Sequence, residues 1–240
     1  MIELKNISKA YLKNKNIIEN LNLTIKNGEI FGFLGPNGAG KTTTIKMITG
    51  IIKPSNGEVY IDGISIKEKP LEAKKNFSYV PDSPDMFLSL TGNEYLNFMA
   101  DMYNIPLKIR TERINNFAMQ FEIIENLDQR ILEYSHGMRQ KIVLIGALLN
   151  DSNNLILDEP MVGLDPKAAY VLKKIMREYA NANKTVLFST HVLEIAEKIC
   201  DRVCIINKGE IITIGTIDEI KQKFNNGTLE NIFLEITEDE

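Results

Sequence analysis

A glycine-rich segment between an apolar run and a helix-like segment constrains the fold of this chain more than any other feature. Residues 30–34 are nearly all apolar, as in a strand that is covered on both faces. Residues 35–42 then follow the pattern G-x-x-x-x-G-K-[ST], and a plausible helix covers residues 43–49. A strand, a glycine-rich turn and a helix in this order predict an α/β fold with an anion-binding loop.

The residue types of this segment suit the binding of a nucleotide polyphosphate. Glycines let backbone N–H groups approach the phosphates, and the helix N-terminus adds a partial positive charge. Lys41 would reach the β- and γ-phosphates of ATP, and the Thr42 hydroxyl would be a ligand of Mg²⁺. A glycine-rich turn with a surface lysine is the alternative. The predicted nucleotide-binding residues here are Gly35, Pro36, Asn37, Gly38, Ala39, Gly40, Lys41, Thr42 and Thr43.

A second apolar run, residues 155–157, ends in the acidic pair Asp158 and Glu159. The carboxyl ends of parallel strands meet at the ligand crevice, so this pair is expected to lie near the glycine-rich segment at residues 35–42, the phosphate loop. Asp158 would hold Mg²⁺ opposite Thr42, and Glu159 would polarise the water that attacks the γ-phosphate. Without the phosphate loop, a strand that stops at a charged loop would explain the same residues.

The remaining pattern divides the chain into two kinds of structure. Period-two alternation in the first 30 residues predicts antiparallel strands, and apolar runs between later helix-like segments predict a mostly parallel sheet. Residues 84–149 carry helical stretches and no convincing buried strand. The expected organisation is a single domain with an α/β nucleotide core at 1–83 and 150–222, an inserted helical lobe at 84–149 and a tail at 223–240.

Composition excludes some functional classes. The 28 Lys and Arg residues against 32 Asp and Glu residues give a net charge of −4, so no overall charge attracts nucleic acid. The longest stretch without a charged side chain covers residues 30–40, and a membrane-spanning helix needs about 20 apolar residues. The first residues lack the apolar core of a signal peptide, and two cysteines fit a reducing cytosol.

Several short motifs, in order along nearly the whole chain, resemble those of ATP-binding cassette (ABC) ATPases. Residues 134–140, Tyr-Ser-His-Gly-Met-Arg-Gln, resemble the signature motif and end 158 − 140 = 18 residues before Asp158, as in that family. Three other positions resemble the D-loop, the switch histidine and the adenine-stacking aromatic: Asp165, His191 and Tyr11. The resemblance implies a P-loop NTPase (RecA-like) core with an N-terminal antiparallel β part and an inserted helical lobe.

The resemblance also implies a head-to-tail dimer that closes on two ATP molecules. The signature residues of one subunit, Ser135, His136, Gly137 and Met138, would face the phosphate loop of the other. In that family the serine and the Gly137 amide contact the γ-phosphate, and Asp165 would help to join the two sites. His191 would contact the γ-phosphate beside Glu159. A helix N-cap is the plain alternative for Ser135 and is compatible with this role.

One position departs from the family pattern. Residues 79–82, Tyr-Val-Pro-Asp, align with the Q-loop, where glutamine is usual and Asp82 stands here. The shorter carboxylate can still reach Mg²⁺, so Asp82 joins Thr42 and Asp158 as a predicted metal ligand. It also adds negative charge beside the metal and the triphosphate.

Three features favour a transporter subunit within the ABC family. The chain has one phosphate loop, it has no long heptad insert, and its helical lobe follows Asp82, where transporter cassettes receive their membrane partner. Apolar side chains that could line a docking groove there, or belong to the core, are Met86, Phe87, Leu88, Tyr95, Leu96, Phe98, Met99 and Met102. The expected partners are a membrane-spanning permease and a second ATP-binding subunit, with no nucleic acid.

The tail at residues 227–237 resembles the end of cassettes that serve bacterial drug, peptide and antibiotic exporters, so export is the expected direction. The expected location is the cytoplasmic face of the cell membrane, as a peripheral subunit. A soluble ABC-type ATPase with a regulatory or nucleic-acid- or ribosome-linked role is the alternative. A P-loop kinase would leave the signature and the switch histidine without a purpose.

Overall fold

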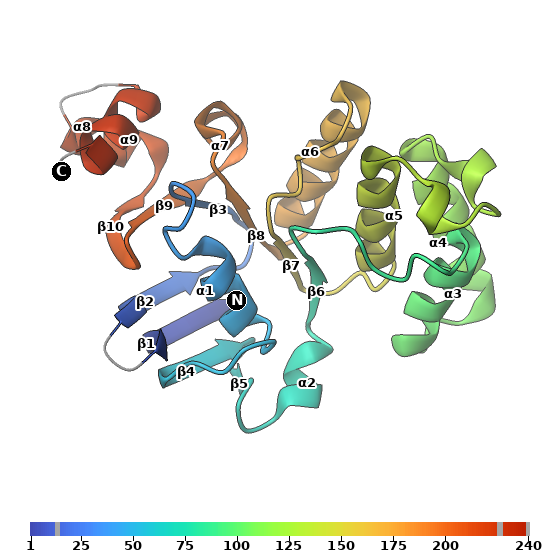
Figure 1. The fold of residues 1–240 in the computed structure, drawn as a ribbon, viewed down its shortest axis with the longest axis horizontal. Coiled ribbons are helices and arrows are strands. Elements are labelled where there is room, and N and C mark those ends of the chain that lie inside the picture. The colour runs from blue at the N-terminus through green and yellow to red at the C-terminus, as the bar shows by residue number, and fades with distance from the viewer. Residues whose placement is uncertain (13–14, 225–227, 239–240) are drawn as a thin grey trace.

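The strands of the protein form two sheets, which a computed structural model describes for residues 1–12, 15–224 and 228–238, without the side chains of 11, 12, 15, 16 and 236–238. A six-stranded sheet has the order β10-β9-β3-β8-β7-β6, and a four-stranded sheet has the order β2-β1-β4-β5 (Figure 1). The strands are β1 (Ile2–Leu12), β2 (Lys15–Ile25), β3 (Ile30–Leu34), β4 (Asn56–Ile61), β5 (Ile64–Ser65), β6 (Phe77–Val80), β7 (Asn154–Leu157), β8 (Thr185–Thr190), β9 (Arg202–Asn207) and β10 (Glu210–Gly215).

The six-stranded sheet is the core that positions the site. Its strands pair in parallel from β6 to β9, and β10 alone pairs antiparallel at one edge. Strands β3, β7 and β8 are buried along their whole length, which explains the apolar runs within them. The mostly parallel α/β sheet predicted from the sequence is confirmed. Because the strands are parallel, the loops after β3, β6, β7 and β8 all begin at the same side of the sheet, where the carboxyl ends of the strands lie.

Helix α1 (Lys41–Ile48) packs against the core sheet on one side and against the antiparallel sheet on the other. Strand β1 pairs with β2 through Ile2 with Ile25 and Leu4 with Leu23, so the alternation predicted antiparallel strands correctly. One hydrophobic cluster contains side chains of α1, of β1 and β4 in this sheet, and of β3 in the other. Helix α1 is therefore held between the two sheets (Figure 1).

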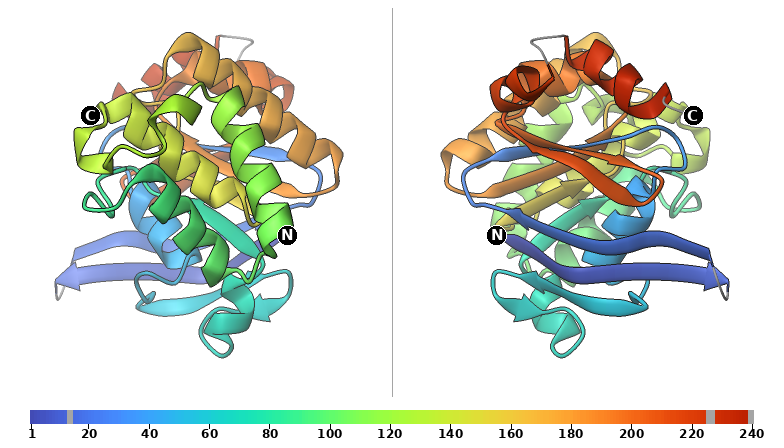
Figure 2. Two further views of the ribbon diagram at one scale, coloured as in Figure 1. Left: turned by 90° about the vertical axis from the view of Figure 1, so that its right-hand side faces the viewer. Right: turned by 90° about the vertical axis from the view of Figure 1, so that its left-hand side faces the viewer.

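Three longer helices lie together beside the β6–β7 edge of the core (Figures 1 and 2). They are α3 (Gly92–Met102), α4 (Leu107–Gln120) and α5 (His136–Leu148), with the short helices η1 (Ile124–Asn126) and η2 (Ile131–Glu133) between α4 and α5. The bounds of helix α4 have local causes. Pro106 caps its start with a φ suited to a helix, and Glu122, with a φ of +54°, stops it from continuing.

The remaining helices cover the core and its C-terminal side. They are α2 (Pro70–Lys74), α6 (Pro166–Asn181), α7 (Leu193–Ile199), α8 (Ile217–Lys223) and α9 (Leu229–Glu238). The described part of the tail is helical, and the buried side chains of Leu229 and Ile232 attach α9 to the body of the protein. Among the described residues, no helix is both long and apolar enough to cross a membrane.

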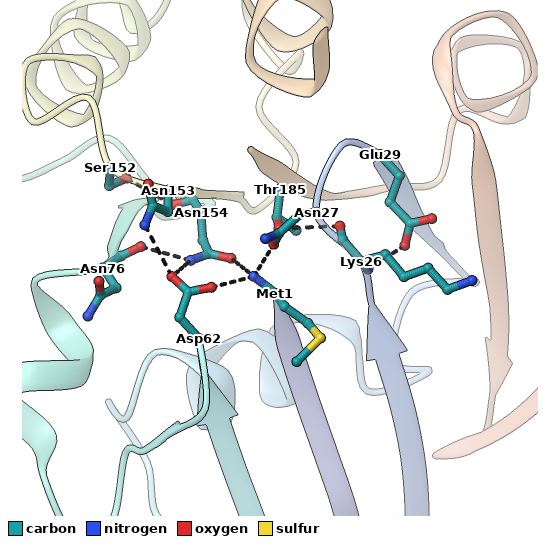
Figure 3. A network of polar contacts seen from close by, with 10 residues as sticks. All are labelled: Met1, Lys26, Asn27, Glu29, Asp62, Asn76, Ser152, Asn153, Asn154 and Thr185. Carbon is teal, nitrogen blue, oxygen red and sulfur yellow. Dashed lines mark hydrogen bonds and ion pairs between the residues drawn. The ribbon is translucent and has the colours of Figure 1, made fainter. Parts of the chain in front are cut away.

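A polar network at Met1 connects the two sheets (Figure 3). The amino group of Met1 donates to Asp62 at 2.5 Å, to Asn154 at 3.0 Å and to Asn27. Asn154, which is buried at the start of β7, donates to Asp62 at 2.9 Å. The network anchors the first strand of the antiparallel sheet to the amino ends of the core strands, at the opposite edge from the phosphate loop.

Candidate functional site

The phosphate loop connects β3 to α1, as predicted. Gly40 is the N-cap of α1 and has a φ of 105°, a conformation that favours glycine. A Cβ atom at Gly40 would also lie 2.5 Å from the Ile18 side chain of β2. The helix N-terminus has no side-chain cap and no acidic residue in its first turn. Its amide groups and partial positive charge therefore remain available to an anion.

Lys41 is buried under the loop that precedes it. Its Nζ donates to the carbonyl oxygens of Gly35 at 2.7 Å and Pro36 at 3.2 Å. The same atom lies 3.8 Å from Oε1 of Glu159. Burial lowers the pKa of Lys41, and the Glu159 and Asp158 carboxylates offset part of this effect. A phosphate would provide the buried ammonium group with a stronger partner than the two carbonyls.

Asp158 lies at the end of β7, beneath the loop, and has no exposed surface. Its Oδ1 accepts a hydrogen bond of 2.6 Å from the Ser189 hydroxyl. Its Oδ2 is buried and has no hydrogen-bond partner among the residues that the structure describes. Burial raises the pKa of Asp158, and the Ser189 and Thr42 hydroxyls, which face the carboxylate, lower it in part. An unpartnered buried oxygen near Thr42 fits the coordination of a divalent cation.

Glu159 occupies a left-handed backbone conformation with a φ of +48°, which is uncommon for a residue with a side chain. Its N–H donates to Ser189 Oγ at 2.9 Å. Both carboxylate oxygens lie 3.1 Å from Nδ1 of His191, the residue that follows β8. The side chain of Glu159 is thereby held between His191 and Lys41, at the same edge of the sheet. The predicted proximity of Glu159 to the loop and to His191 is therefore observed.

A pocket of about 390 Å³ opens at this edge. Its lining residues are Ile17, Asn37, Gly38, Gly40, Lys41, Thr42, Thr43, Asp82 and Glu159. Asp82 follows β6 and is exposed, and its charge contributes to the raised pKa of Asp158. The pocket therefore combines an amide-rich helix start and one lysine with two carboxylates, which suits a phosphate chain accompanied by a cation.

The predicted signature residues lie elsewhere in the same chain, at the start of α5. Ser135 is the N-cap of this helix and accepts from the Met138 N–H at 3.3 Å. A Cβ atom at Gly137 would lie 2.6 Å from the Gly163 carbonyl oxygen, and His136 packs against Gly163. None of residues 135–138 lines the pocket. Figure 1 shows α5 on the far side of β6 and β7 from α1.

Asp165 is engaged within its own chain. Its side chain caps α6 by accepting from the N–H groups of Lys167 at 3.1 Å and Ala168 at 2.9 Å. It also forms an ion pair of 2.6 Å with Lys141 of α5. The Lys141 ammonium and the two amides hold the pKa of Asp165 below its ordinary value. The segment after β7 is thus attached to α5, the helix that begins at the signature residues.

Two contacts were not predicted, and one predicted residue cannot be assessed. The sequence does not predict a role for Ser189 or Lys141, because each acts on a residue distant in the sequence. The position of Ser189, two residues before His191 in a buried strand, was the only available signal. The side chain of Tyr11 lies outside the described residues.

Comparison with known proteins gives a consistent family. A family model described as "ABC transporter" matches residues 18–162. The ABC-type transporter ATP-binding protein EcsA of Bacillus subtilis is 31% identical over 242 residues, which cover 100% of this chain and 98% of EcsA. The linearmycin resistance ATP-binding protein LnrL of Bacillus subtilis is 34% identical over 229 residues, which cover 95% of this chain and 73% of LnrL.

One relative is considerably longer than the matched region. The uncharacterized ABC transporter ATP-binding protein all4389 of Nostoc is 37% identical over 205 residues, covering 85% of this chain. The match spans 61% of all4389, less than two thirds of its length.

Two solved structures share the fold. An ATP-binding subunit of an ABC transporter has a TM-score of 0.93 and 32% identity, and the match covers 98% of this chain and 99% of that one. The ATP-binding cassette MJ0796, a dimer in a post-hydrolysis state with ADP and phosphate bound, has a TM-score of 0.79 and 26% identity. That match covers 90% of this chain and 98% of the MJ0796 chain.

Proposed function

This chain belongs to the ABC transporter family of ATP-binding proteins, and we propose that it hydrolyses ATP to energise a separate membrane permease, in the direction of export. The observation that carries the hydrolytic part is the pocket after β3, where the buried Lys41 ammonium lies 3.8 Å from Glu159. A cation for the phosphates and a carboxylate for the water lie side by side at a helix N-terminus. Family membership, shown by the comparisons, supports the same reaction.

The chain's own residues perform three tasks in this reaction. The amides of the phosphate loop and Lys41 bind the triphosphate and stabilise the charge that develops on the γ-phosphate. Glu159 orients the attacking water and accepts its proton. His191, whose Nδ1 lies 3.1 Å from both oxygens of Glu159, orients that carboxylate beside the γ-phosphate. Tyr11 is proposed to stack on the adenine.

Mg²⁺ fits the polar groups below the loop. Asp158 offers the unpartnered Oδ2, Thr42 faces the same carboxylate, and Asp82 lines the pocket above them. Mg²⁺ is usually held by one or two carboxylates together with substrate phosphates, and the donor set here matches that habit. When bound, the ion would neutralise charge on the β- and γ-phosphate oxygens.

A second ATP-binding subunit is proposed to complete the site. The helix N-terminus at Ser135 is suited to an anion, yet it does not line the pocket of its own chain. A head-to-tail pair would place the signature residues of one subunit against the phosphate loop of the other, so that ATP binds between them. The dimeric state of the related MJ0796 cassette supports this arrangement.

The permease is proposed to dock on the lobe formed by α3, α4 and α5. Of the apolar set predicted for a groove, Tyr95 and Leu96 are core residues. Four others are exposed to different degrees and form the docking patch: Met86, Phe87, Phe98 and Met102. The rings of Phe87 and Phe98 are in contact, with centroids 5.4 Å apart. Exposed aromatic and methionine side chains in one place are typical of an adaptable protein interface.

Export is supported by the relatives alone, which include the linearmycin resistance protein LnrL and a Nod factor export ATP-binding protein of Rhizobium meliloti. The proposed location is the cytoplasmic face of the membrane, where the permease would hold the chain.

Nucleotide binding by the Lys41→Ala variant tests the hydrolytic part of the proposal. A charge-assisted hydrogen bond to phosphate contributes about 1.5–3 kcal/mol, so the loss of Lys41 should weaken ATP binding by roughly 10- to 100-fold or more. Fluorescence titration with a labelled ATP analogue measures the change. The Lys46→Ala variant, whose side chain is partly exposed on the same helix and lies outside the pocket lining, should bind normally. Full retained affinity in Lys41→Ala would refute the phosphate-loop assignment.

Purification from native membranes tests the transport part. Recovery of the chain with a polytopic membrane protein would support the permease. ATPase stimulation by DNA or ribosomes, with no such partner recovered, would contradict the transport role and favour a soluble ABC-type ATPase.

A further inference from the structure

The hydroxyl of Ser189 lies between the two acidic residues of the site. Strands β7 and β8 pair in parallel with Leu157 opposite Phe188, so the next residues, Asp158 and Ser189, are neighbours. Ser189 is buried and does not line the pocket. Its side chain is therefore in a position to act on the pocket residues without touching the nucleotide.

Two short hydrogen bonds with defined directions meet at this hydroxyl. The backbone N–H of Glu159 can only donate, so Ser189 Oγ accepts in the 2.9 Å contact. The O–H of Ser189 then donates a hydrogen bond of 2.6 Å to Oδ1 of Asp158. One hydroxyl thus uses its acceptor and its donor capacity on consecutive residues, and no water is needed to satisfy either bond.

The first bond acts on the backbone of Glu159. This residue has a φ of +48°, a conformation that costs free energy for a residue with a Cβ atom and persists only where the surroundings enforce it. The bond to Ser189 gives the N–H a partner in this turn. This backbone turn directs the Glu159 carboxylate towards His191 and Lys41.

The second bond acts on the rotation of the Asp158 carboxylate. Because Oδ1 is occupied by Ser189, Oδ2 is the oxygen without a hydrogen-bond partner among the described residues. A carboxylate held at one oxygen presents the other in a fixed direction. Partners of this kind, one step removed from the metal, orient the ligand itself.

We propose that Ser189 is a positioning residue that sets both the carboxylate of Asp158 for a divalent cation and the backbone turn of Glu159 for the attacking water. The inference rests on the proposed ATPase function and deepens it. Ser189 would then affect Mg²⁺ binding and turnover together, and it would leave metal-free nucleotide binding unchanged.

Two variants separate the hydroxyl from simple packing. Ser189→Ala removes both hydrogen bonds and leaves a small space, whereas Ser189→Cys nearly retains the volume but replaces the hydroxyl by a weak donor and acceptor. Ser78→Ala is the matched control. Ser78 is equally buried, lies in β6 of the same sheet and contacts Ser152 at 2.9 Å. Ser152 also has the Asn154 carbonyl oxygen at 3.0 Å as a partner, so this control leaves it satisfied.

The experiment measures binding of a fluorescent ATP analogue (MANT-ATP) in EDTA and during a Mg²⁺ titration, together with kcat. Thermal melting confirms that each variant is folded. Loss of a residue that orients a metal ligand typically costs about 10- to 100-fold in metal affinity or activity. Ser189→Ala and Ser189→Cys should therefore raise the half-saturating Mg²⁺ concentration about tenfold and lower kcat. Binding in EDTA, and every value for Ser78→Ala, should match the wild type.

Three outcomes would overturn the inference: a wild-type Mg²⁺ titration in Ser189→Ala, wild-type behaviour in Ser189→Cys alone, or an equal change in Ser78→Ala. The second outcome would show that packing, and not the hydroxyl, matters. Failure of the proposed function is distinct from all three. It would appear in the wild-type protein itself, as MANT-ATP binding that does not respond to Mg²⁺ and an absence of turnover.

Discussion

The charges of individual residues determine how strongly the pocket binds a triphosphate. Lys41 is a buried cation whose pKa is lowered by burial, and it faces Asp158 and Glu159 across the phosphate loop. Asp82 adds a third carboxylate to the neighbourhood. With more carboxylates than lysines in the pocket, a divalent cation should strengthen the binding of the triphosphate. We therefore expect the residue at position 82 to affect how strongly nucleotide binding depends on the metal.

The Asp82→Gln variant tests this electrostatic balance. Removal of one negative charge should improve ATP binding in EDTA and raise the Mg²⁺ concentration needed for half-maximal activity, by about tenfold if Asp82 orients or binds the ion. Titration of ATPase activity and of ATP binding with Mg²⁺ measures both effects. The neighbouring Ser83→Ala variant, which is exposed and outside the pocket lining, is the control. Superimposable Mg²⁺ titrations of Asp82→Gln and wild type would exclude a role for Asp82 at the metal.

The N-termini of three helices connect the parts of the site. Helix α1 begins uncapped at the phosphate loop, whereas α5 and α6 begin with the side-chain caps Ser135 and Asp165. Lys141 joins α5 to the Asp165 cap. Local sequence patterns predicted the loop and the N-cap at Ser135, because an N-cap is made by residues two or three positions apart. They could not predict the Lys141 contact, because it depends on how two helices pack.

Loss of the Asp165 cap should destabilise the protein in a pH-dependent way. Asp165→Ala should cost about 0.5–2 kcal/mol in the free energy of unfolding at pH 7. The folded pKa of Asp165 lies below its ordinary value of 3.8, so the ionised form is the stabilising one. Its contribution is complete above that ordinary value and is lost as the pH falls through the lower folded value.

Urea unfolding at pH 7 and at pH 3 measures this effect. The difference between wild type and Asp165→Ala should shrink at the lower pH, and the exposed Glu112→Ala variant on α4 should show no comparable loss at pH 7. An equal difference at both pH values would mean that the charge of Asp165 does not stabilise the fold.

The docking patch belongs to the helical lobe and can be tested apart from the pocket. Phe98 is 41% exposed on α3 and contacts Phe87, so Phe98→Asp places a charge at the centre of the patch. The purified variant should hydrolyse ATP at the wild-type basal rate but lose most of its association with membranes of its native host. Leu71→Asp, an equally drastic change at an exposed site on α2, should retain it. Normal membrane recovery of Phe98→Asp would place the permease contact elsewhere.

For the whole molecule, the sequence predicted the class of fold and most of the residues at the edge of the sheet. Unbroken apolar strands, a glycine-rich turn and a strand ending in two acids are local features that the parallel topology brings together. The Ser189 contacts could not be predicted in the same way. They join residues 31 and 30 positions apart, and they depend on the exact pairing of β7 with β8. The strained backbone at Glu159 likewise has no local signal.

The whole chain also accounts for the need for a partner. Its pocket holds the loop, the lysine and the acids, but the anion-binding helix start at Ser135 lies apart from that pocket. ATP should therefore act as the bridge between two cassettes. We expect hydrolysis to weaken this bridge, so a variant that binds ATP without hydrolysing it should hold the pair together.

The most direct test of this account is the mass in solution of Glu159→Gln with and without ATP and Mg²⁺, measured by light scattering. The variant should lose turnover by at least about 100-fold, bind ATP, and change from a monomer of 27.2 kDa to a dimer of twice that mass. A second change, Ser135→Arg, should abolish the ATP-dependent dimer while ATP binding persists. A Glu159→Gln protein that binds ATP but remains a monomer, or that hydrolyses ATP at the wild-type rate, would contradict the account.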